Sequence, residues 1–155
     1  MSTPPVASDY QTGHVGLNVS ELGRSVDFYT RVFGWDVKSR SDEDGKAFAF
    51  LGDQTRLVLT LWQQSGGRFP ADQPGLHHLS FQVDSIDEVQ AAEARLRDAG
   101  ARLFHDGIVP HGEGMSSGGI FFEDPDGIRL EIYAPQGADD HQDVPSGNAP
   151  TCGFF

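Results

Sequence analysis

The most informative feature of this sequence is a segment that occurs twice. The runs His14–Val19 and His78–Val83 each begin with a histidine, continue with alternating residues, and lead into a stretch whose apolar residues have helical spacing. A glycine suited to end a helix follows 20 residues after the first histidine and 22 residues after the second, at Gly34 and Gly100. This near-equal spacing predicts two copies of one structural unit.

Each copy is predicted to form a β-α-β-β-β module. Ser20 is the expected N-cap of the first helix, and Asp84-Ser85 leads into the second. A short extended segment and a hairpin follow each helix. The second hairpin turns through Asp124-Pro125-Asp126-Gly127, which fits a type I turn. The sequence therefore predicts an α+β fold of two tandem β-α-β-β-β modules.

Composition divides the chain further. The sequence around 63–75 has the Gly, Pro and Gln content of a linker, and the sequence from Gly137 onward is rich in Asp, Gly, Pro and Asn. Phe154-Phe155 is unusual in such a tail and is suited to fold back onto an apolar surface. We predict a flexible N-terminal segment (1–12), a first module (13–62), a linker (63–76), a second module (77–135) and a flexible C-terminal tail (136–155).

Charge and cysteine content exclude several kinds of partner. With 11 Lys and Arg against 23 Asp and Glu, a net charge of −12 and no basic cluster, the surface is expected to repel nucleic acid. No apolar run reaches the ~18 residues of a membrane span, and the N-terminal residues lack the pattern of a secretory signal. A single cysteine, Cys152, permits no disulfide within the chain. We therefore expect a cytoplasmic protein without nucleic-acid or membrane partners.

The two histidines and one carboxylate predict a metal site. Because side chains alternate between the faces of a strand, His14 and His78 at the two strand starts can meet an inward Glu131 from the strand 128–133. His77 is expected to point the other way. Two imidazoles and a carboxylate with open positions suit Fe(II) and Mn(II), and to varying degrees Zn, Ni and Co. A carboxylate in this otherwise apolar strand would be costly to bury unpaired, which favours the ligand role.

The paired modules and the run Phe122–Ile132 resemble the vicinal oxygen chelate superfamily. That superfamily includes glyoxalase I, extradiol dioxygenases, methylmalonyl-CoA epimerase, fosfomycin-modifying transferases and bleomycin-binding proteins. The resemblance covers residues 12 to 135 and is specific for the superfamily rather than for one activity. It implies one glyoxalase-like domain (13–135), with curved mixed sheets around a metal and substrate cavity. It also implies a metal held by His14, His78 and Glu131, and a substrate that chelates it through neighbouring oxygens.

A fourth ligand is missing from this pattern. Glyoxalase I and the epimerase carry it on the last strand of the first module. Aligning Arg56-Leu57 with Arg129-Leu130 places Val58 there, and valine cannot bind a metal. Thr60 or Gln63 would take this place only through a shift in register. The resemblance therefore disfavours the two four-ligand activities.

Two further positions bear on the activity. Phe121 lies ten residues before Glu131. By the same resemblance, extradiol dioxygenases and fosfomycin transferases have a tyrosine at this position. Arg129 is expected to point away from Glu131, which leaves no cation near the site to hold a phosphonate. Standard catechol cleavage and fosfomycin opening are both put in doubt.

Under this alignment the second module is seven residues longer than the first. The extra residues fall in His105–Gly118. We interpret this segment as a long polar, glycine-rich loop in which His111 and Glu113 are candidate proton carriers. The candidate walls of the substrate site are Phe48, Phe50, Leu59, Trp62 and Phe121.

The predicted function is that of a divalent-metal-dependent enzyme, of dioxygenase or lyase type, acting on a small, oxygen-chelating, aromatic substrate. The alternative is a protein that sequesters an antibiotic, as bleomycin-binding members do, although those members generally lack the metal residues. A structural or sensory metal site is a third interpretation. A homodimer is expected, and the sequence leaves open whether the site forms within one chain or takes His14 from one chain and His78 with Glu131 from the other.

Overall fold

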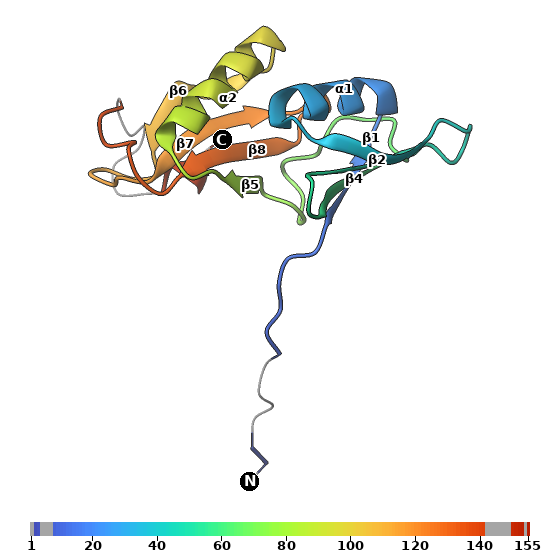
Figure 1. The fold of residues 1–155 in the computed structure, drawn as a ribbon, viewed down its shortest axis with the longest axis horizontal. Coiled ribbons are helices and arrows are strands. Elements are labelled where there is room, and N and C mark those ends of the chain that lie inside the picture. Colours follow the sequence, from blue (N-terminus) through green and yellow to red (C-terminus); the bar gives the residue numbers. More distant parts are fainter. Residues whose placement is uncertain (1, 4–7, 142–149, 154) are drawn as a thin grey trace.

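The computed structural model describes residues 2–3, 8–141, 150–153 and 155, so parts of the predicted segments 1–12 and 136–155 lie outside the described residues. In the described chain two four-stranded mixed sheets lie next to each other, and each carries one long helix. Both helices lie on the same side of the sheets (Figure 1). The predicted α+β fold of two tandem modules is confirmed.

The first module contains five elements in the predicted order. They are β1 (Val15–Val19), α1 (Leu22–Phe33), β2 (Asp36–Ser41), β3 (Phe48–Gly52) and β4 (Leu57–Gln63). The strands lie in the order β1-β4-β3-β2, with β1 parallel to β4 and the other pairs antiparallel.

The second module repeats this arrangement. Its elements are β5 (Leu79–Gln82), α2 (Ile86–Asp98), β6 (Leu103–Pro110), β7 (Gly118–Glu123) and β8 (Arg129–Ala134). The strand order β5-β8-β7-β6 matches that of the first sheet, and β5 is parallel to β8. A short 3-10 helix, Thr151–Gly153, follows later in the chain.

The helix ends differ in one respect from the sequence prediction. Gly34 ends α1 in a left-handed conformation, with φ 71°, as expected. However, the N-cap of α1 is Glu21, whose carboxylate accepts hydrogen bonds from two backbone N–H groups of the first turn. Ser20 was the wrong residue, because its hydroxyl and its backbone N–H both bind Asp126 of the second module. In α2, Ser85 forms a full capping box with the third helical residue.

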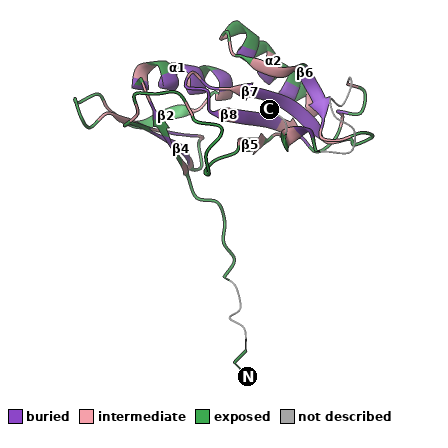
Figure 2. Ribbon diagram, turned by 180° about the vertical axis from the view of Figure 1, so that it is seen from behind, coloured by how far each residue is buried: buried purple, intermediate pink, exposed green. Residues whose placement is uncertain are grey.

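The hydrophobic core lies between the helices and the sheets, and strand alternation decides which residues enter it. In β8, Leu130, Ile132 and Ala134 are buried in this core. Glu131 and Tyr133 project from the opposite face of the sheet. Figure 2 colours buried residues purple, and they make up most of β7 and β8. We call the helix-free face of each sheet the open face; in the second sheet this face carries Ser80 and Glu131.

The predicted loop of the second module is shorter than expected. Strand β6 extends to Pro110, so only the part after that residue connects β6 to β7 as a loop. His105 and Asp106 interrupt β6 with positive φ values of 58° and 56°, and the pairing with β7 shifts in register between Phe104 and Val109. Polar and glycine residues in 105–107 therefore mark a bulge in a strand, not a loop.

The turn between β7 and β8 joins the two modules. The buried hydroxyl of Tyr29 in α1 donates to Asp124 Oδ2 at 2.8 Å, and Asp124 Oδ1 accepts from two backbone N–H groups of its own turn. Asp126 accepts from Ser20 and forms an ion pair with Arg24 at 3.0 Å. We call Ser20, Arg24, Tyr29, Asp124 and Asp126 the module clamp.

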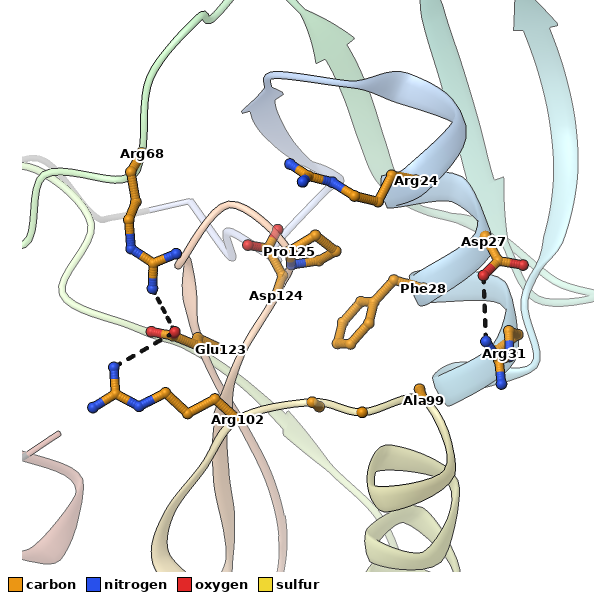
Figure 3. Close-up of a pocket in the computed structure, with 12 residues that line it drawn as sticks. Arg24, Asp27, Phe28, Arg31, Arg68, Ala99, Arg102, Glu123, Asp124 and Pro125 are labelled. Atoms are coloured by element: carbon orange, nitrogen blue, oxygen red, sulfur yellow. Dashed lines mark hydrogen bonds and ion pairs between the residues drawn. The ribbon is translucent and has the colours of Figure 1, made fainter.

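A cavity of about 350 Å³ lies beside this clamp. Figure 3 shows Glu123 between Arg68 and Arg102, with both of which it forms ion pairs, and Phe28 beneath the turn. Because these arginines are already paired with acidic groups, the cavity is best explained as the junction of the modules.

None of the helices in the part of the chain that the structure describes is long and apolar enough to cross a membrane.

Candidate functional site

Three potential metal ligands meet on the open face of the second sheet. Donor atoms of His78, Glu131 and Cys152 all lie within 4.8 Å of one another. His78 directly precedes β5, Glu131 lies in the middle of β8, and Cys152 belongs to the 3-10 helix. The parallel pairing of β5 with β8 sets Ser80 opposite Glu131, which brings the start of β5 close to the carboxylate. Two of the three predicted metal residues are therefore brought together.

Glu131 has the surroundings of a carboxylate that binds a cation. It is only 3% exposed. Its Oε1 accepts a hydrogen bond from Ser80 Oγ at 2.6 Å and lies 3.4 Å from His111 Nε2. Among the described residues, its Oε2 is buried without a hydrogen-bond partner. Because an unpaired buried carboxylate oxygen is costly, this donor set fits a divalent metal ion.

His78 is suited to bind a metal in its neutral form. Its Nδ1 lies 2.8 Å from Nδ1 of His77. Burial lowers the pKa of His78, and the opposing attraction of Glu131 does not offset this effect. The neutral imidazole, which is the form that binds metals, is therefore favoured near neutral pH.

Cys152 was not identified as a site residue from the sequence. Burial, and then the negative charge of Glu131, raise the pKa of its thiol. Without a bound cation the neutral thiol is therefore favoured, which argues against an activated nucleophile, whereas a metal ion deprotonates a thiol that coordinates it. Cys152 lies more than twenty positions from His78 and Glu131, and no sequence pattern connects them. The sequence alone therefore gives no indication that Cys152 belongs to the site.

The two candidate proton carriers have different positions. His111 lies in the site, with Nδ1 3.0 Å from Ser117 Oγ and Nε2 facing Glu131. Glu113 is exposed in the connecting loop and makes no hydrogen bond or ion pair described in the structure. A cleft of about 500 Å³ is lined by Ser80, Gln82, His111, Ser117, Glu131, Tyr133, Pro135 and Cys152.

His14 is not brought to this site within the described chain. It is exposed and precedes β1 of the other sheet, and it is not in the group formed by His78, Glu131 and Cys152.

The candidate substrate walls separate into three environments. Phe48, Phe50 and Trp62 form one aromatic cluster on the first sheet, with ring centroids 5.0–5.7 Å apart. Leu59 was a wrong choice, because it is fully buried in the core on the helix side of β4. Phe121 lies opposite Glu131 in the β7–β8 register but is fully buried, with Phe155 against its ring at 5.3 Å.

The register also corrects the alignment of the two modules. Gly16 pairs with Thr60 in the first sheet just as Ser80 pairs with Glu131 in the second. Thr60, not Val58, is therefore the equivalent of Glu131. A bulge in the β3–β4 pairing, next to Gly52, accompanies this two-residue difference. Thr60 is almost fully buried and accepts a hydrogen bond from Trp62 Nε1, so this position still lacks a carboxylate.

Arg129 lies on the same face as Glu131, contrary to the sequence prediction, because residues two apart in a strand share a face. Its guanidinium carbon lies 5.5 Å from the centre of the Phe155 ring. Ser80 could have been found by the same rule, since it lies two residues after His78.

Several known proteins are similar to this chain in sequence. Residues 11–132 match the family described as Glyoxalase/Bleomycin resistance protein/Dioxygenase superfamily. A catechol-2,3-dioxygenase of Bacillus subtilis is 28% identical over 131 residues, which are 83% of this chain but only 43% of the dioxygenase. A lactoylglutathione lyase of Neisseria meningitidis is 30% identical over 132 residues, which are 82% of this chain and 92% of the lyase.

Solved structures give the same result. A glyoxylase/bleomycin resistance protein/dioxygenase domain from Frankia sp. has a TM-score of 0.69 and 30% identity, and covers 83% of this chain and 100% of its own. The fosfomycin resistance protein FosX of Listeria monocytogenes, solved with Mn(II) and dihydroxypropylphosphonic acid, has a TM-score of 0.62 and 20% identity over 81% of this chain and 90% of its own. The chain belongs to the glyoxalase/bleomycin resistance protein/dioxygenase superfamily.

Proposed function

We propose that this protein is a metal-dependent enzyme whose divalent ion is held by His78 and Glu131 on the open face of the second sheet. The observation that carries the proposal is the buried Oε2 of Glu131, which has no hydrogen-bond partner among the described residues and belongs to a cluster with His78. A cation would compensate this oxygen. Imidazole and carboxylate donors suit Fe(II) and Mn(II), and Zn, Ni or Co less specifically.

We further propose that His14 of a second copy completes the ligand set. His14 is exposed in the single chain, and the open face of the first sheet carries the apolar cluster Phe48, Phe50 and Trp62, in which Trp62 is 36% exposed. A two-fold homodimer that placed this face over the second sheet of the other copy would cover the cluster and bring His14 to the metal. Two equivalent sites would result.

The residues around the cleft support acid–base chemistry on a small substrate. When bound, the metal would polarise substrate oxygens as a Lewis acid. His111 Nε2 borders the cleft, and the Ser117 hydroxyl at its Nδ1 orients the ring, so His111 is placed to move a proton to or from the substrate. Ser80 holds Glu131 Oε1 in place. Phe48, Phe50 and Trp62 of the second copy would form an apolar wall.

We therefore propose dioxygenase- or lyase-type chemistry on a small aromatic substrate with neighbouring oxygens. The names of two relatives, a catechol dioxygenase and a lactoylglutathione lyase, support these reaction types. Phe121 cannot supply the hydroxyl of a tyrosine at its position, so substrate contacts would have to come from other groups, such as Arg129 or Tyr133.

Metal removal and reloading test the proposal. Chelator-treated protein is reloaded with Fe(II) or Mn(II), and oxygen uptake with a panel of catechols and isomerisation of hemithioacetals are measured. Substituting a residue that only supports a metal ligand lowers metal affinity by roughly 10–100-fold. Because Glu131 is proposed as a ligand itself, Glu131→Gln should lower the affinity by more than this. Glu113→Gln, which changes an exposed loop residue, is the matched control and should bind metal normally. Undiminished turnover by stripped protein would overturn the proposal, and tight binding of bleomycin without turnover would support sequestration instead.

Subunit mixing tests the shared site. His14→Ala and Glu131→Gln chains, each inactive alone, are unfolded together and refolded. If the sites are shared, a mixed dimer keeps one intact site, so a 1:1 mixture should recover about one quarter of wild-type activity. No recovery, or sedimentation as a 16.8 kDa species only, would refute the shared site.

A further inference from the structure

We infer that Cys152 is a ligand of the metal in the second module, delivered to the site by the segment of residues 150–153 and 155, which we call the closing segment. The inference rests on the proposed metal site, but it does not depend on His14. It adds a sulfur donor to the nitrogen of His78 and the oxygen of Glu131.

The distances suit a shared ion. Two donors that each lie 2.0–2.3 Å from one ion are at most about 4.6 Å apart, or slightly more when one of them is sulfur. The donors of His78, Glu131 and Cys152 all lie within 4.8 Å of one another, so small side-chain adjustments would bring them to one ion. Glu131 Oε2, which is buried and has no hydrogen-bond partner among the residues that the structure describes, is an independent sign that a cation belongs there. The thiol therefore lies close to a buried carboxylate whose Oε2 can accept a cation.

Backbone contacts hold Cys152 in this place. The preceding residue, Thr151, is fully buried. Its backbone N–H donates to the carbonyl of His111 at 2.8 Å, and its hydroxyl donates to the carbonyl of Pro110 at 2.8 Å. Both acceptors lie at the end of β6, beside the cleft. These two hydrogen bonds hold the start of the 3-10 helix over the site, next to Cys152.

Phe155 provides a second attachment on the same face. Its ring lies 5.3 Å from that of Phe121, 5.2 Å from that of Phe104 and 5.4 Å from that of His78. The Arg129 guanidinium is stacked over it at 5.5 Å. Contacts on both sides of Cys152 therefore hold the closing segment against the second sheet.

The sulfur donor would change which metal the site prefers. Thiolate ligands favour softer ions, whereas carboxylate and water suit Mn(II). One nitrogen, one oxygen and one sulfur donor would shift the preference from Mn(II) toward Zn(II) and Co(II). Three protein ligands also leave a position open for substrate, as in catalytic zinc sites.

Cobalt(II) spectroscopy tests this inference directly, because the chain has only one cysteine and any thiolate signal must come from Cys152. Metal-free full-length protein is titrated with Co(II), and the near-ultraviolet thiolate-to-cobalt charge-transfer absorption is recorded together with the visible ligand-field bands. The wild type should show both. Cys152→Ser should lose the charge-transfer absorption and keep the ligand-field bands, with Co(II) affinity at least roughly 10-fold weaker.

The outcomes separate the inference from the function on which it rests. Ligand-field bands without charge-transfer absorption in the wild type would overturn the role of Cys152 and leave the His78–Glu131 site intact. Failure of the wild type to bind Co(II) at all would overturn both. In competition experiments the ratio of Zn(II) to Mn(II) affinity should fall in Cys152→Ser, and an unchanged ratio would contradict the inference.

Two controls address the segment and the fold. Phe155→Ala keeps the thiol but removes an attachment, so it should weaken Co(II) binding and reduce the charge-transfer absorption at subsaturating metal. Unchanged binding in this variant would contradict delivery by the closing segment. Circular dichroism and thermal unfolding of metal-free Cys152→Ser should match the wild type, which would exclude misfolding as the cause of lost absorption.

Discussion

Replacing Tyr29 with phenylalanine should weaken the connection between the two modules. The Tyr29 side chain is fully buried, Asp124 is 4% exposed, and the hydroxyl donates to Asp124 Oδ2 at 2.8 Å. Tyr29→Phe removes this donor and adds no bulk. The aromatic ring remains against Phe28 and Phe33, with centroids at 5.3 and 6.0 Å, so the change isolates the hydrogen bond.

The magnitude follows from the charge and burial of the acceptor. A hydrogen bond to a charged group contributes about 1.5–3 kcal/mol, and its loss here would leave a buried carboxylate oxygen without a partner. For a chain of 155 residues, 1 kcal/mol shifts Tm by about 2–4 °C, so Tyr29→Phe should lower Tm by about 3–12 °C. Urea unfolding followed by circular dichroism gives the free energy of unfolding.

Tyr133→Phe is the matched control. It removes the same atom from an exposed hydrogen bond of equal length, 2.8 Å to Gln82 Oε1, and should change the free energy of unfolding by no more than about 0.5 kcal/mol. If Tyr29→Phe costs no more than this control, the clamp does not stabilise the fold as argued. A double-mutant cycle with Asp124→Asn should then give a coupling energy near zero.

Three other perturbations have defined outcomes. Burial raises the pKa of Asp124 above its ordinary value of 3.8, so the folded state binds the carboxyl proton more tightly than the unfolded state does. The stability that Asp124 contributes should therefore fall as the pH rises from 3.8 through the folded pKa. Urea unfolding of the wild type at several pH values should show this fall, and Asp124→Asn should abolish it. A divalent metal at about 100 times its Kd should stabilise the wild type by about 2.7 kcal/mol in thermal unfolding, and Glu131→Gln should remove the effect. Gly119→Ala should cost about 1–3 kcal/mol, because a Cβ there would lie 2.1 Å from the carbonyl oxygen of Ile132, whereas Gly66→Ala, which meets nothing within 4 Å, should be tolerated.

The repeat allowed the fold to be predicted, because helix periodicity and strand alternation are local properties of the sequence. Gly34 and the hairpin turn at Asp124–Gly127 are placed by their own backbone preferences, and both were located correctly. Ser20 was misassigned because its actual partner, Asp126, is 106 positions away. The bulge at His105 was misread as a loop for a similar reason, since the pairing of β6 with β7 decides its conformation.

The candidate site was predictable only where strand alternation controls it. Glu131 and His78 meet because adjacent parallel strands align them. The contribution of Cys152 depends on how the closing segment returns to the sheet, through hydrogen bonds to Pro110 and His111, and nothing local in the sequence specifies those contacts. The alignment of Val58 with Glu131 failed because sequence similarity could not reveal a bulge.

The corrected register shows that the two modules share one strand arrangement but carry different side chains at equivalent positions. At equivalent positions the first sheet has Gly16 and Thr60, whereas the second has Ser80 and Glu131. A hydroxyl that accepts a hydrogen bond from Trp62 thus replaces the carboxylate, and the neighbouring side chains of that face are Phe48 and Phe50 instead of metal donors. One sheet therefore presents an apolar aromatic face, and the other presents charged donors around a cleft. The substrate proposed above, which would bind a metal through its oxygens and has an aromatic body, would gain contacts from both surfaces. In the single chain these two surfaces lie on separate sheets, so the proposed second copy would bring the aromatic face of one chain opposite the metal donors of the other.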